Sequence, residues 1–353
     1  MKLPFATTYL LILLTCSLAS PQYAQSSDYN FSSPPSSLVE RGAGVSNQGN
    51  ILRPWPVNDP VASRKLTVIE FCFALLPFRE QALFRFMMAI DIWINALGGE
   101  AGPHSGHSIA FQETFYSDGT PLPCYIPGTA QNHPPYGQWN PVLPSHILQI
   151  MPVSDRDSAV ASVGYRVGVN LENGRHSMAF APDFDVERIY MLVHELGHVF
   201  GMMHEHQRSD RDDFVQINWP AISGYETGLQ AAMTEGFSKE EAEYRLQTEE
   251  AFGKYFNVPT GDFNKAVNGI LGPPDDPYTI DESSPYDIDS LMNYASAHYS
   301  LAPDSGDAKD ATILKWVKDE SGNKIGSVPY PHNTAPSVGD VAWIRKWYPW
   351  RGA

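Results

Sequence analysis

One stretch of eleven residues constrains this chain of 353 residues more than any other. It runs from His194 to His204 and reads H-E-L-G-H-V-F-G-M-M-H. Residues four apart lie one turn apart on a helix, so His194 and His198 share a face and can bind one metal ion. Glu195 stands beside the first of them, where its carboxylate can reach a water on that ion. The spacing therefore predicts a helix that carries a metal site.

The end of this stretch indicates how a third ligand reaches the ion. Gly201 can adopt a positive φ, so the helix can stop there and the chain can turn back. His204 then brings a third nitrogen. Three protein ligands and one open position are typical of catalytic zinc, whereas a structural zinc is closed by a fourth protein ligand. A lone buried histidine is more often a core residue, but five fixed positions make chance a poor explanation, and we expect one zinc ion per subunit.

The flanking positions support the helix. Asp185 is a suitable N-cap residue. Six apolar residues fall on the broad arc away from the two histidines: Ile189, Leu192, Val193, Leu196, Val199 and Phe200. A helix with this pattern packs one face into a core and turns the other face to a cleft.

Charge and the N-terminus limit the partners and the location. The formal net charge is −16, which argues against nucleic acid, because phosphate binding needs basic surfaces. Residues 1–19 read as a signal peptide, with Lys2, an apolar run at 9–14 and small residues before Ala19. That run is too short to span a bilayer. We expect a secreted chain with no membrane anchor; its oligomeric state is left open.

Residues 20–50 are rich in Ser, Pro, Gly and Asn and are expected to be a disordered propeptide or linker, with a glycosylation sequon at Asn30. Cys16 would leave with the signal peptide. Cys72 and Cys124 remain, and two alternatives are open for them: a disulfide of an oxidising compartment, or plain thiols, since Cys72 lies in an apolar strand pattern.

Order is expected to begin near Ile51. The hydrophobic patterns predict strands at 66–73, 108–113, 146–151, 160–169 and 177–181, the last as a short edge strand, helices at 79–97, 238–252 and 338–347, and a long loop at 118–144.

The residues after His204 narrow the family. The run from His194 to Trp219 reads HELGHVFGMMHEHQRSDRDDFVQINW. It resembles the astacin family of metzincin zinc endopeptidases, whose pattern is HExxHxxGxxHExxRxDRDxxVxI. Glu205, directly after the third histidine, is the residue by which astacins differ from other metzincins. In the family this glutamate meets the mature N-terminus.

Two shorter stretches agree with the resemblance. Residues 287–294 read DIDSLMNY and are similar to the Met-turn of the family, SxMHY. Met292 is then the methionine that packs beneath the zinc. Tyr294 is the family's tyrosine, a weak extra ligand that swings away to stabilise the transition state. Residues 53–56, RPWP, are similar to the start of the mature family domain.

The resemblance implies an α+β fold of the metzincin type with two lobes. Residues 51–204 would form an N-terminal catalytic lobe with a mixed sheet and two long helices, one of them the zinc helix. Residues 205–353 would form a C-terminal lobe, mostly irregular with short helices, that carries the Met-turn.

The chain also departs from the family. Asn293 replaces the histidine of the Met-turn, and the cysteine pattern of the family disulfides is not matched. The segment between His204 and Met292 looks longer than usual. Residues 20–50 hold no FxGD-type aspartate switch.

The function expected is a secreted zinc-dependent endopeptidase. Protein or peptide substrates would be hydrolysed by a zinc-activated water, with Glu195 as the general base and Tyr294 stabilising the oxyanion. The first alternative is a secreted non-catalytic zinc-binding protein that keeps the protease fold; a degenerate copy of that kind would be expected to lose Glu195 or a ligand, and none is lost here. The second is a zinc hydrolase that acts on something other than peptides.

Overall fold

A computed structural model of the chain describes residues 44–45, 52–58, 65–131, 135–155, 158–167, 172–271 and 278–352. The predicted signal peptide at 1–19 and the sequon at Asn30 lie outside these residues. Of the predicted linker at 20–50, the structure describes Gly44 and Val45, which form the short strand β1 (Gly44–Val45). Among the described residues, no helix has both the length and the apolar character that crossing a bilayer needs.

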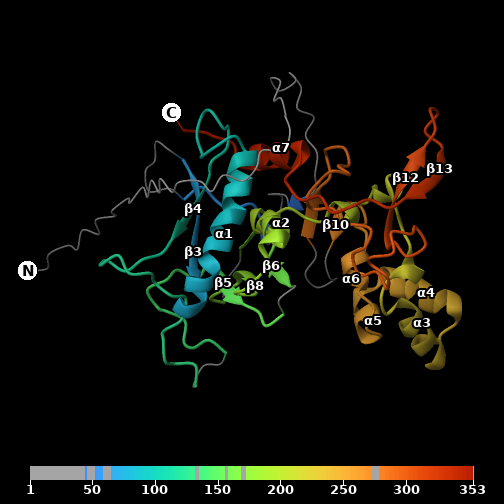
Figure 1. Cartoon of the computed structure of the whole chain (residues 1–353), viewed down its shortest axis with the longest axis horizontal. Coiled ribbons are helices and arrows are strands. Elements are labelled where there is room, and N and C mark those ends of the chain that lie inside the picture. Colours follow the sequence, from blue (N-terminus) through green and yellow to red (C-terminus); the bar gives the residue numbers. More distant parts are fainter. Residues whose placement is uncertain are drawn as a thin grey trace, which may run out of the picture. The chain divides into compact units, whose positions relative to one another are not determined.

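A five-stranded mixed sheet organises the first part of the chain (Figure 1). Its order is β4-β3-β5-β8-β6, and the strands are parallel except β6, which pairs antiparallel with β8. The strands are β3 (Thr67–Phe73), β4 (Ile109–Glu113), β5 (Leu148–Pro152), β6 (Ala159–Ala161) and β8 (His176–Phe180). The predicted edge strand at 177–181 was misplaced: it is β8, an inner strand, and β6 forms the edge beside it. β8 pairs with a strand on each side, and its Met178, Ala179 and Phe180 are buried.

Two helices lie against this sheet. They are α1 (Leu76–Ala96), which Pro77 opens in the first turn, and α2 (Ile189–Phe200). The indole Nε1 of Trp93 on α1 donates to the carbonyl of Val193 on α2 at 2.7 Å, and the Trp93 ring meets Phe200 edge-on. The apolar arc predicted for α2 therefore faces a core shared with α1, which leaves the histidine face free for a site.

The two remaining cysteines form a disulfide. Cys72 of β3 is bonded to Cys124, and their Cα atoms lie 5.3 Å apart. Both side chains are fully buried, in a small apolar cluster with Leu122, Leu143 and Ile147. Of the two alternatives, the bridge is the one observed, and it fastens the long loop between β4 and β5 to the centre of the sheet.

The second part of the chain has its own core. Four short helices follow one another: α3 (Tyr225–Thr234), α4 (Lys239–Thr248), α5 (Glu250–Tyr255) and α6 (Thr260–Phe263). Ser238 caps α4 by accepting from the Glu241 amide, but the helix predicted at 238–252 is broken at Glu249 into α4 and α5. Apolar side chains of α3 to α6 pack together with β9 (Val215–Ile217), β12 (Ile313–Lys318) and Tyr286. The short helices expected here are confirmed.

Small sheets and turns complete the fold. β9 and β12 form a sheet with β13 (Lys324–Val328). β1, β10 (Ile270–Leu271) and β11 (Tyr278–Asp281) form another, and β2 (Leu52–Arg53) pairs with β7 (Tyr165–Arg166). In the described part of the stretch predicted as one strand at 160–169, the structure has two short strands, β6 and β7. The 3-10 turns are η1 (Val186–Arg188), η2 (Glu205–Gln207), η3 (Arg211–Asp213) and η4 (Trp219–Ala221).

The last helix, α7 (Val338–Trp347), has the predicted bounds. Its N-terminus is a capping box in which Ser337 and Asp340 satisfy each other's backbone amides. Trp343 and Ile344 of α7 are buried in the same core as α1 and α2, together with Met292. The C-terminal helix α7 thus packs in the same core as α2, the helix that carries His194 and His198. The division of the chain at residue 204 stays a prediction.

Candidate metal centre

Three histidine side chains converge at the end of α2. His194 and His198 lie on α2, and His204 follows the turn after it. The Nε2 atom of His204 is 3.1 Å from Nε2 of His194 and 3.1 Å from Nε2 of His198. His198 is buried, whereas His194 and His204 are only partly buried, so solvent can reach the group. The structure therefore brings together the three residues that the motif singled out.

Gly201 makes this convergence possible. It ends α2 with φ +104°, in the left-handed region, as predicted. The amides of Gly201 and Met202 bond back to the carbonyls of His198 and Gly197 at 2.8 and 2.9 Å, which closes the helix end and reverses the chain. A side chain at Gly201 would be strained in this conformation.

Hydrogen bonds fix the tautomer of each ring. Nδ1 of His194 bonds the carbonyl of Leu291 at 2.9 Å, and Nδ1 of His198 bonds the carbonyl of Met202 at 2.9 Å. Carbonyl oxygens only accept, so each Nδ1 carries the proton. Nδ1 of His204 bonds Oε1 of Gln207 at 3.1 Å, and the Gln207 amide is oriented by its own Nε2, which donates to the Gly261 carbonyl at 2.8 Å.

This arrangement fits a metal ion and little else. With the protons on Nδ1, all three Nε2 atoms present lone pairs to one another, and none can donate to the next. Zinc holds imidazole nitrogens at about 2.0–2.1 Å, which in tetrahedral geometry places them about 3.3 Å apart. The two 3.1 Å separations are close to that value. Outer hydrogen bonds to Nδ1 are also the usual support of metal-binding histidines.

The rings are held neutral, which metal binding requires. Burial lowers the pKa of His198 to about 4. Burial and the neighbouring imidazole of His198 lower the pKa of His194 and of His204 well below the usual value. Each Nε2 lone pair is therefore available at neutral pH.

Glu195 lies beside the triad and is kept from solvent. It is buried, and its carboxylate accepts a hydrogen bond from the backbone of Ala161 on the edge strand β6. Burial raises its pKa to about 8, against the opposing effect of that hydrogen bond. A carboxylate that can hold a proton near neutral pH is suited to general acid–base chemistry.

Met292 packs against the helix that carries His194 and His198. Its side chain is fully buried, and its sulfur occupies the space where a Cβ of Gly197 would lie. The motif position between Leu196 and His198 can therefore hold only glycine unless Met292 moves. The same turn supplies the Leu291 carbonyl that orients His194.

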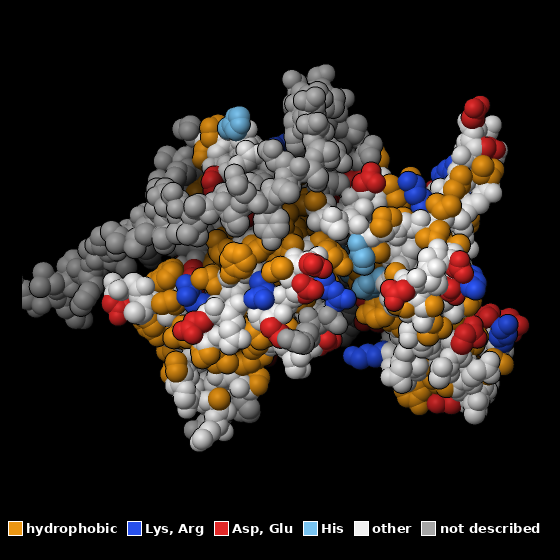
Figure 2. All heavy atoms as spheres, viewed as in Figure 1, with side chains coloured by type: hydrophobic (Ala, Val, Ile, Leu, Met, Phe, Trp, Pro, Cys, Tyr) orange, Lys and Arg blue, Asp and Glu red, His pale blue; other side chains and the backbone are white. Residues whose placement is uncertain are grey.

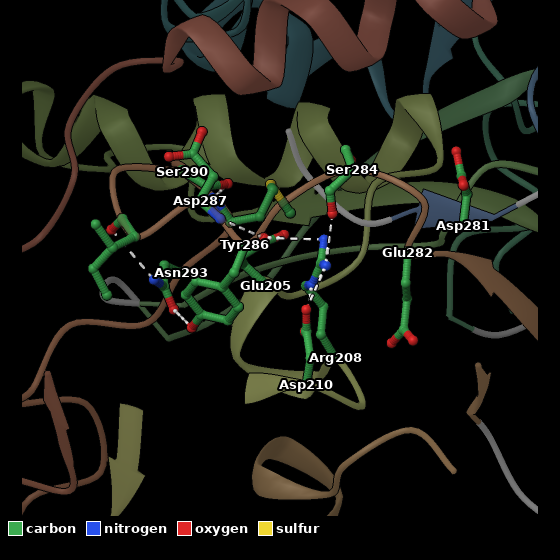
Figure 3. A network of polar contacts seen from close by, with 12 residues as sticks. Glu205, Arg208, Asp210, Asp281, Glu282, Ser284, Tyr286, Asp287, Ser290 and Asn293 are labelled. Carbon is green, nitrogen blue, oxygen red and sulfur yellow. Dashed lines mark hydrogen bonds and ion pairs between the residues drawn. The ribbon is translucent and has the colours of Figure 1, made fainter. Parts of the chain in front are cut away.

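Glu205 ties the segment that follows His204 to the turn at residues 287–294 (Figure 3). Its amide donates to the Met292 carbonyl at 3.1 Å, and its Oε1 accepts from the Asp287 amide at 2.7 Å. Arg208 lies 3.4 Å from Oε1 and also donates to the Ser284 carbonyl at 2.7 Å. Burial raises the pKa of Glu205 to about 8. Its network is a structural clamp between the two segments.

Tyr294 lies at the site but bonds away from the histidines. Its ring packs against His204, with ring centroids 4.3 Å apart, and its hydroxyl donates to Oδ1 of Asp262 on α6 at 3.2 Å. Burial raises its pKa well above 10, so the phenol keeps its proton. Asn293, the departure from the family Met-turn, bonds Tyr286 at 3.3 Å and the Ile288 carbonyl at 3.3 Å (Figure 3).

Three positions of this site were not foreseen from the sequence: Gln207, Asp262 and Asp340. Asp340 accepts from the Ser290 hydroxyl at 2.6 Å and from the Leu291 amide at 2.8 Å, and so fixes the turn that orients His194. The S-x-x-D capping box at 337–340 was a usable signal for a helix start. The hydrogen bond of Asp340 to Ser290, 50 positions earlier, could not be predicted from the sequence. Gln207 is at a variable position of the family pattern, and Asp262 stands in no motif.

Comparisons with known proteins agree with the motif. Residues 166–252 match the family model Astacin, which describes a peptidase family. The chain is 37% identical over 65 residues to the astacin-like metalloendopeptidase of Mus musculus, which is 18% of this chain and 15% of that protein. It is 29% identical over 162 residues to bone morphogenetic protein 1 of Xenopus laevis, which is 46% of this chain and 16% of that protein. The chain thus spans a small part of the length of these relatives.

A similar solved structure is High choriolytic enzyme 1, a hatching enzyme zinc-protease from Oryzias latipes. The TM-score is 0.41 at 16% sequence identity, over 82% of this chain and 91% of that chain. The predicted resemblance is confirmed by the family match, which covers His194 to His204 and the residues after them.

Proposed function

Because residues 166–252 match the Astacin family model, we propose that the chain is a zinc endopeptidase that hydrolyses peptide bonds in proteins. One observation carries the proposal. The Nε2 atom of His204 lies 3.1 Å from Nε2 of His194 and from Nε2 of His198, and the buried carboxylate of Glu195 is beside them. Zinc held by His194, His198 and His204 supplies a Lewis acid and an activated water to such a site. One ion per subunit accounts for the three donors.

The roles proposed for the other residues follow from their positions. We assign Glu195 to taking up a proton and handing it on, because its buried carboxylate lies beside the three histidines and is held by the backbone of Ala161. Tyr294 is the phenol closest to the ligands by its contact with His204, and we assign it to oxyanion stabilisation once its present hydrogen bond is broken. Glu205, Gly201 and Met292 shape and hold the site.

The edge strand β6 supports a polypeptide substrate. β6 is at the rim of the five-stranded sheet, and its Ala161 contacts Glu195 through the backbone. An extended peptide can add to an exposed strand edge through main-chain hydrogen bonds. This favours peptide over a small-molecule hydrolase substrate. On the face in Figure 2, Lys and Arg side chains are scattered among acidic ones, and histidine side chains reach the surface between α2 and α6.

Location and assembly complete the proposal. The expected signal peptide at 1–19 and the Cys72–Cys124 disulfide favour secretion, because disulfides persist in oxidising compartments. A non-catalytic secreted protein that only binds zinc is the alternative. It is disfavoured because Glu195 and all three histidines are kept.

One experiment separates these functions. The purified protein should contain one zinc, cleave a generic protein such as casein, and lose cleavage on chelation. Glu195→Ala should keep the zinc and lose roughly 10²–10⁴-fold in rate, the usual contribution of a general base, while Glu195→Gln is the matched control for the carboxylate's shape. Undiminished cleavage by Glu195→Ala would refute the proposal. Bound zinc with no cleavage of any protein would favour the zinc-binding alternative or a non-peptide substrate.

A further inference from the structure

The hydroxyl of Tyr294 is bonded to a carboxylate that lies far outside the histidine motif. It donates to Asp262 at 3.2 Å, and Asp262 is on α6, in the helical segment between His204 and the Met-turn. The Tyr294 ring is packed between His204 and His298, with centroids at 4.3 and 3.8 Å. The Tyr294 ring thus lies beside the histidines, while its hydroxyl donates to the Asp262 carboxylate on α6.

Asp262 is presented from a backbone that is fixed to the metal-site segment. The Asp262 carbonyl bonds Nε2 of His206 at 2.8 Å, and the neighbouring Gly261 carbonyl accepts from Gln207 at 2.8 Å. Arg211 donates to the Phe263 carbonyl. Three consecutive carbonyls of α6 are therefore held by the residues that follow His204, so the Asp262 carboxylate has little freedom to move away from Tyr294.

A second phenol donates to the same carboxylate. Tyr299 hydrogen-bonds Asp262 through its hydroxyl. Its backbone has φ +57°, a left-handed conformation that is unfavourable for an aromatic residue and persists only where the surroundings fix it. The Tyr299 carbonyl accepts from the Ser223 amide at 2.8 Å, which is one such constraint. Asp262 is thus a built acceptor for two hydroxyls.

We propose that Asp262 is a positioning residue that keeps the Tyr294 hydroxyl off the metal in the resting protein. The inference rests on the proposed function, because it presumes a metal on the three histidines. A phenol has one proton, and while Asp262 accepts it the proton is not available to a substrate oxygen. Asp262 therefore sets how readily Tyr294 is recruited.

Copper(II) in place of zinc gives a readout that needs no turnover. A phenolate on copper(II) produces a ligand-to-metal charge-transfer band in the visible spectrum. The wild-type protein should lack this band, and Asp262→Ala should show it, because Tyr294 is then free to bind the metal. Asp262→Ala combined with Tyr294→Phe should lose it again.

Two further variants make the test specific. Tyr299→Phe removes the other phenol from Asp262 but leaves the Tyr294 bond, so its spectrum should match the wild type. Asp262→Asn keeps a weaker, neutral acceptor, so its band should be intermediate. If Asp262→Ala fails to fold, the proposal is still tested by the other two variants. The visible band of Asp262→Asn should then be stronger than the band of Tyr299→Phe.

Two results would overturn the inference. A full band in the wild type that Asp262→Ala does not increase would show that Tyr294 is a resting ligand. Absence of the band from every folded Asp262 variant that binds copper stoichiometrically would show that Asp262 is not what holds Tyr294 back. If the wild-type protein binds neither copper nor zinc, it is the proposed metal centre that fails.

Discussion

The two halves of the proposed metal site are held by different kinds of contact. His194 and His198 lie on α2, and backbone carbonyls of Leu291 and Met202 orient their rings. His204 and Tyr294 lie outside the helix, and side chains hold them, Gln207 in one case and Asp262 in the other. A backbone carbonyl survives any substitution of its own residue, whereas a side-chain partner is lost with a single change. The first half is therefore tied to the fold, and the second can be changed by point mutation.

Removal of the metal should have the largest effect and should act unequally on the two halves. Without a cation, three lone pairs face one another, and the His204 side has fewer backbone bonds to keep it in place. Zinc at 1,000 times its dissociation constant stabilises the folded state by about 4 kcal/mol, and chelation should remove that amount.

Hydrogen exchange on the zinc and chelated forms measures the inequality. Amides at 204–208 should lose more protection than amides at 192–198, which keep their helical bonds. Equal loss in both segments would contradict the comparison. Restoring zinc to the chelated sample is the control for irreversible damage.

Asp340→Ala should destabilise the turn at Leu291, whose carbonyl orients His194 on α2. The carboxylate accepts from the Ser290 hydroxyl at 2.6 Å, the Leu291 amide at 2.8 Å and the Ser337 amide at 2.9 Å. Truncation leaves these buried donors unsatisfied, and we expect a loss of about 3 kcal/mol in the free energy of unfolding. Urea denaturation measures it. Asp340→Asn, which keeps an acceptor oxygen, should lose less, and a loss below about 1 kcal/mol in Asp340→Ala would show that the turn is held otherwise.

Acid should destabilise the fold through a histidine that lies away from the metal site. His176 is buried on β8, where Nδ1 bonds the His146 carbonyl at 2.7 Å and Nε2 accepts from the Arg166 amide at 2.8 Å. Burial lowers its pKa from 6.5 to about 4. In the unfolded chain His176 is therefore protonated below pH 6.5, whereas in the folded chain it is protonated only below about pH 4. Stability is full above pH 6.5 and falls as the pH drops to about 4, by about 2–3 kcal/mol.

The matched variant for this effect is His176→Gln, which keeps a donor and an acceptor but cannot become charged. Its free energy of unfolding should fall less between about pH 7 and pH 5 than that of the wild type, both measured by urea denaturation of the chelated protein. Chelation removes the contribution of proton competition at the three ligands. Equal pH dependence in the two proteins would assign the acid sensitivity to other groups.

The sequence predicted the helix half of the site better than the side-chain half, for a physical reason. The patterns behind it are local: the spacing of His194 and His198, the glycine at 201 and the apolar arc. Helix geometry alone is enough to interpret them. The bounds of α7 and most strands of the five-stranded sheet followed from the same kind of pattern.

What was missed depends on contacts between distant segments. Strand order is one case: the segment at 177–181 was expected at an edge and lies inside the sheet. The hold of Asp262 on Tyr294 is another, since 32 positions separate them and no spacing rule joins them. The disulfide was left undecided because Cα proximity, 5.3 Å here across 52 positions, is a property of the fold.

Gln207→Ala offers the finest test of the comparison. Gln207 gives His204 its acceptor at 3.1 Å, and Gly261 of α6 orients the amide. Loss of such an outer partner usually costs roughly 10–100-fold in metal affinity, which is about 1.4–2.7 kcal/mol. Competition with a chromophoric chelator measures it. Gln207→Glu keeps the acceptor and should bind zinc nearly as well as the wild type, although its carboxylate cannot donate to the Gly261 carbonyl.

The helix half supplies the control for that measurement. Substitution of Met202, whose carbonyl serves His198, leaves the acceptor in place because the carbonyl is backbone. Met202→Leu should therefore change zinc affinity by less than about threefold, since it conserves the volume of a buried side chain. If Met202→Leu weakens zinc as much as Gln207→Ala does, the distinction between backbone-held and side-chain-held ligands does not govern affinity in this protein. If only Gln207→Ala weakens it, the third ligand is where metal affinity can be tuned without disturbing the fold.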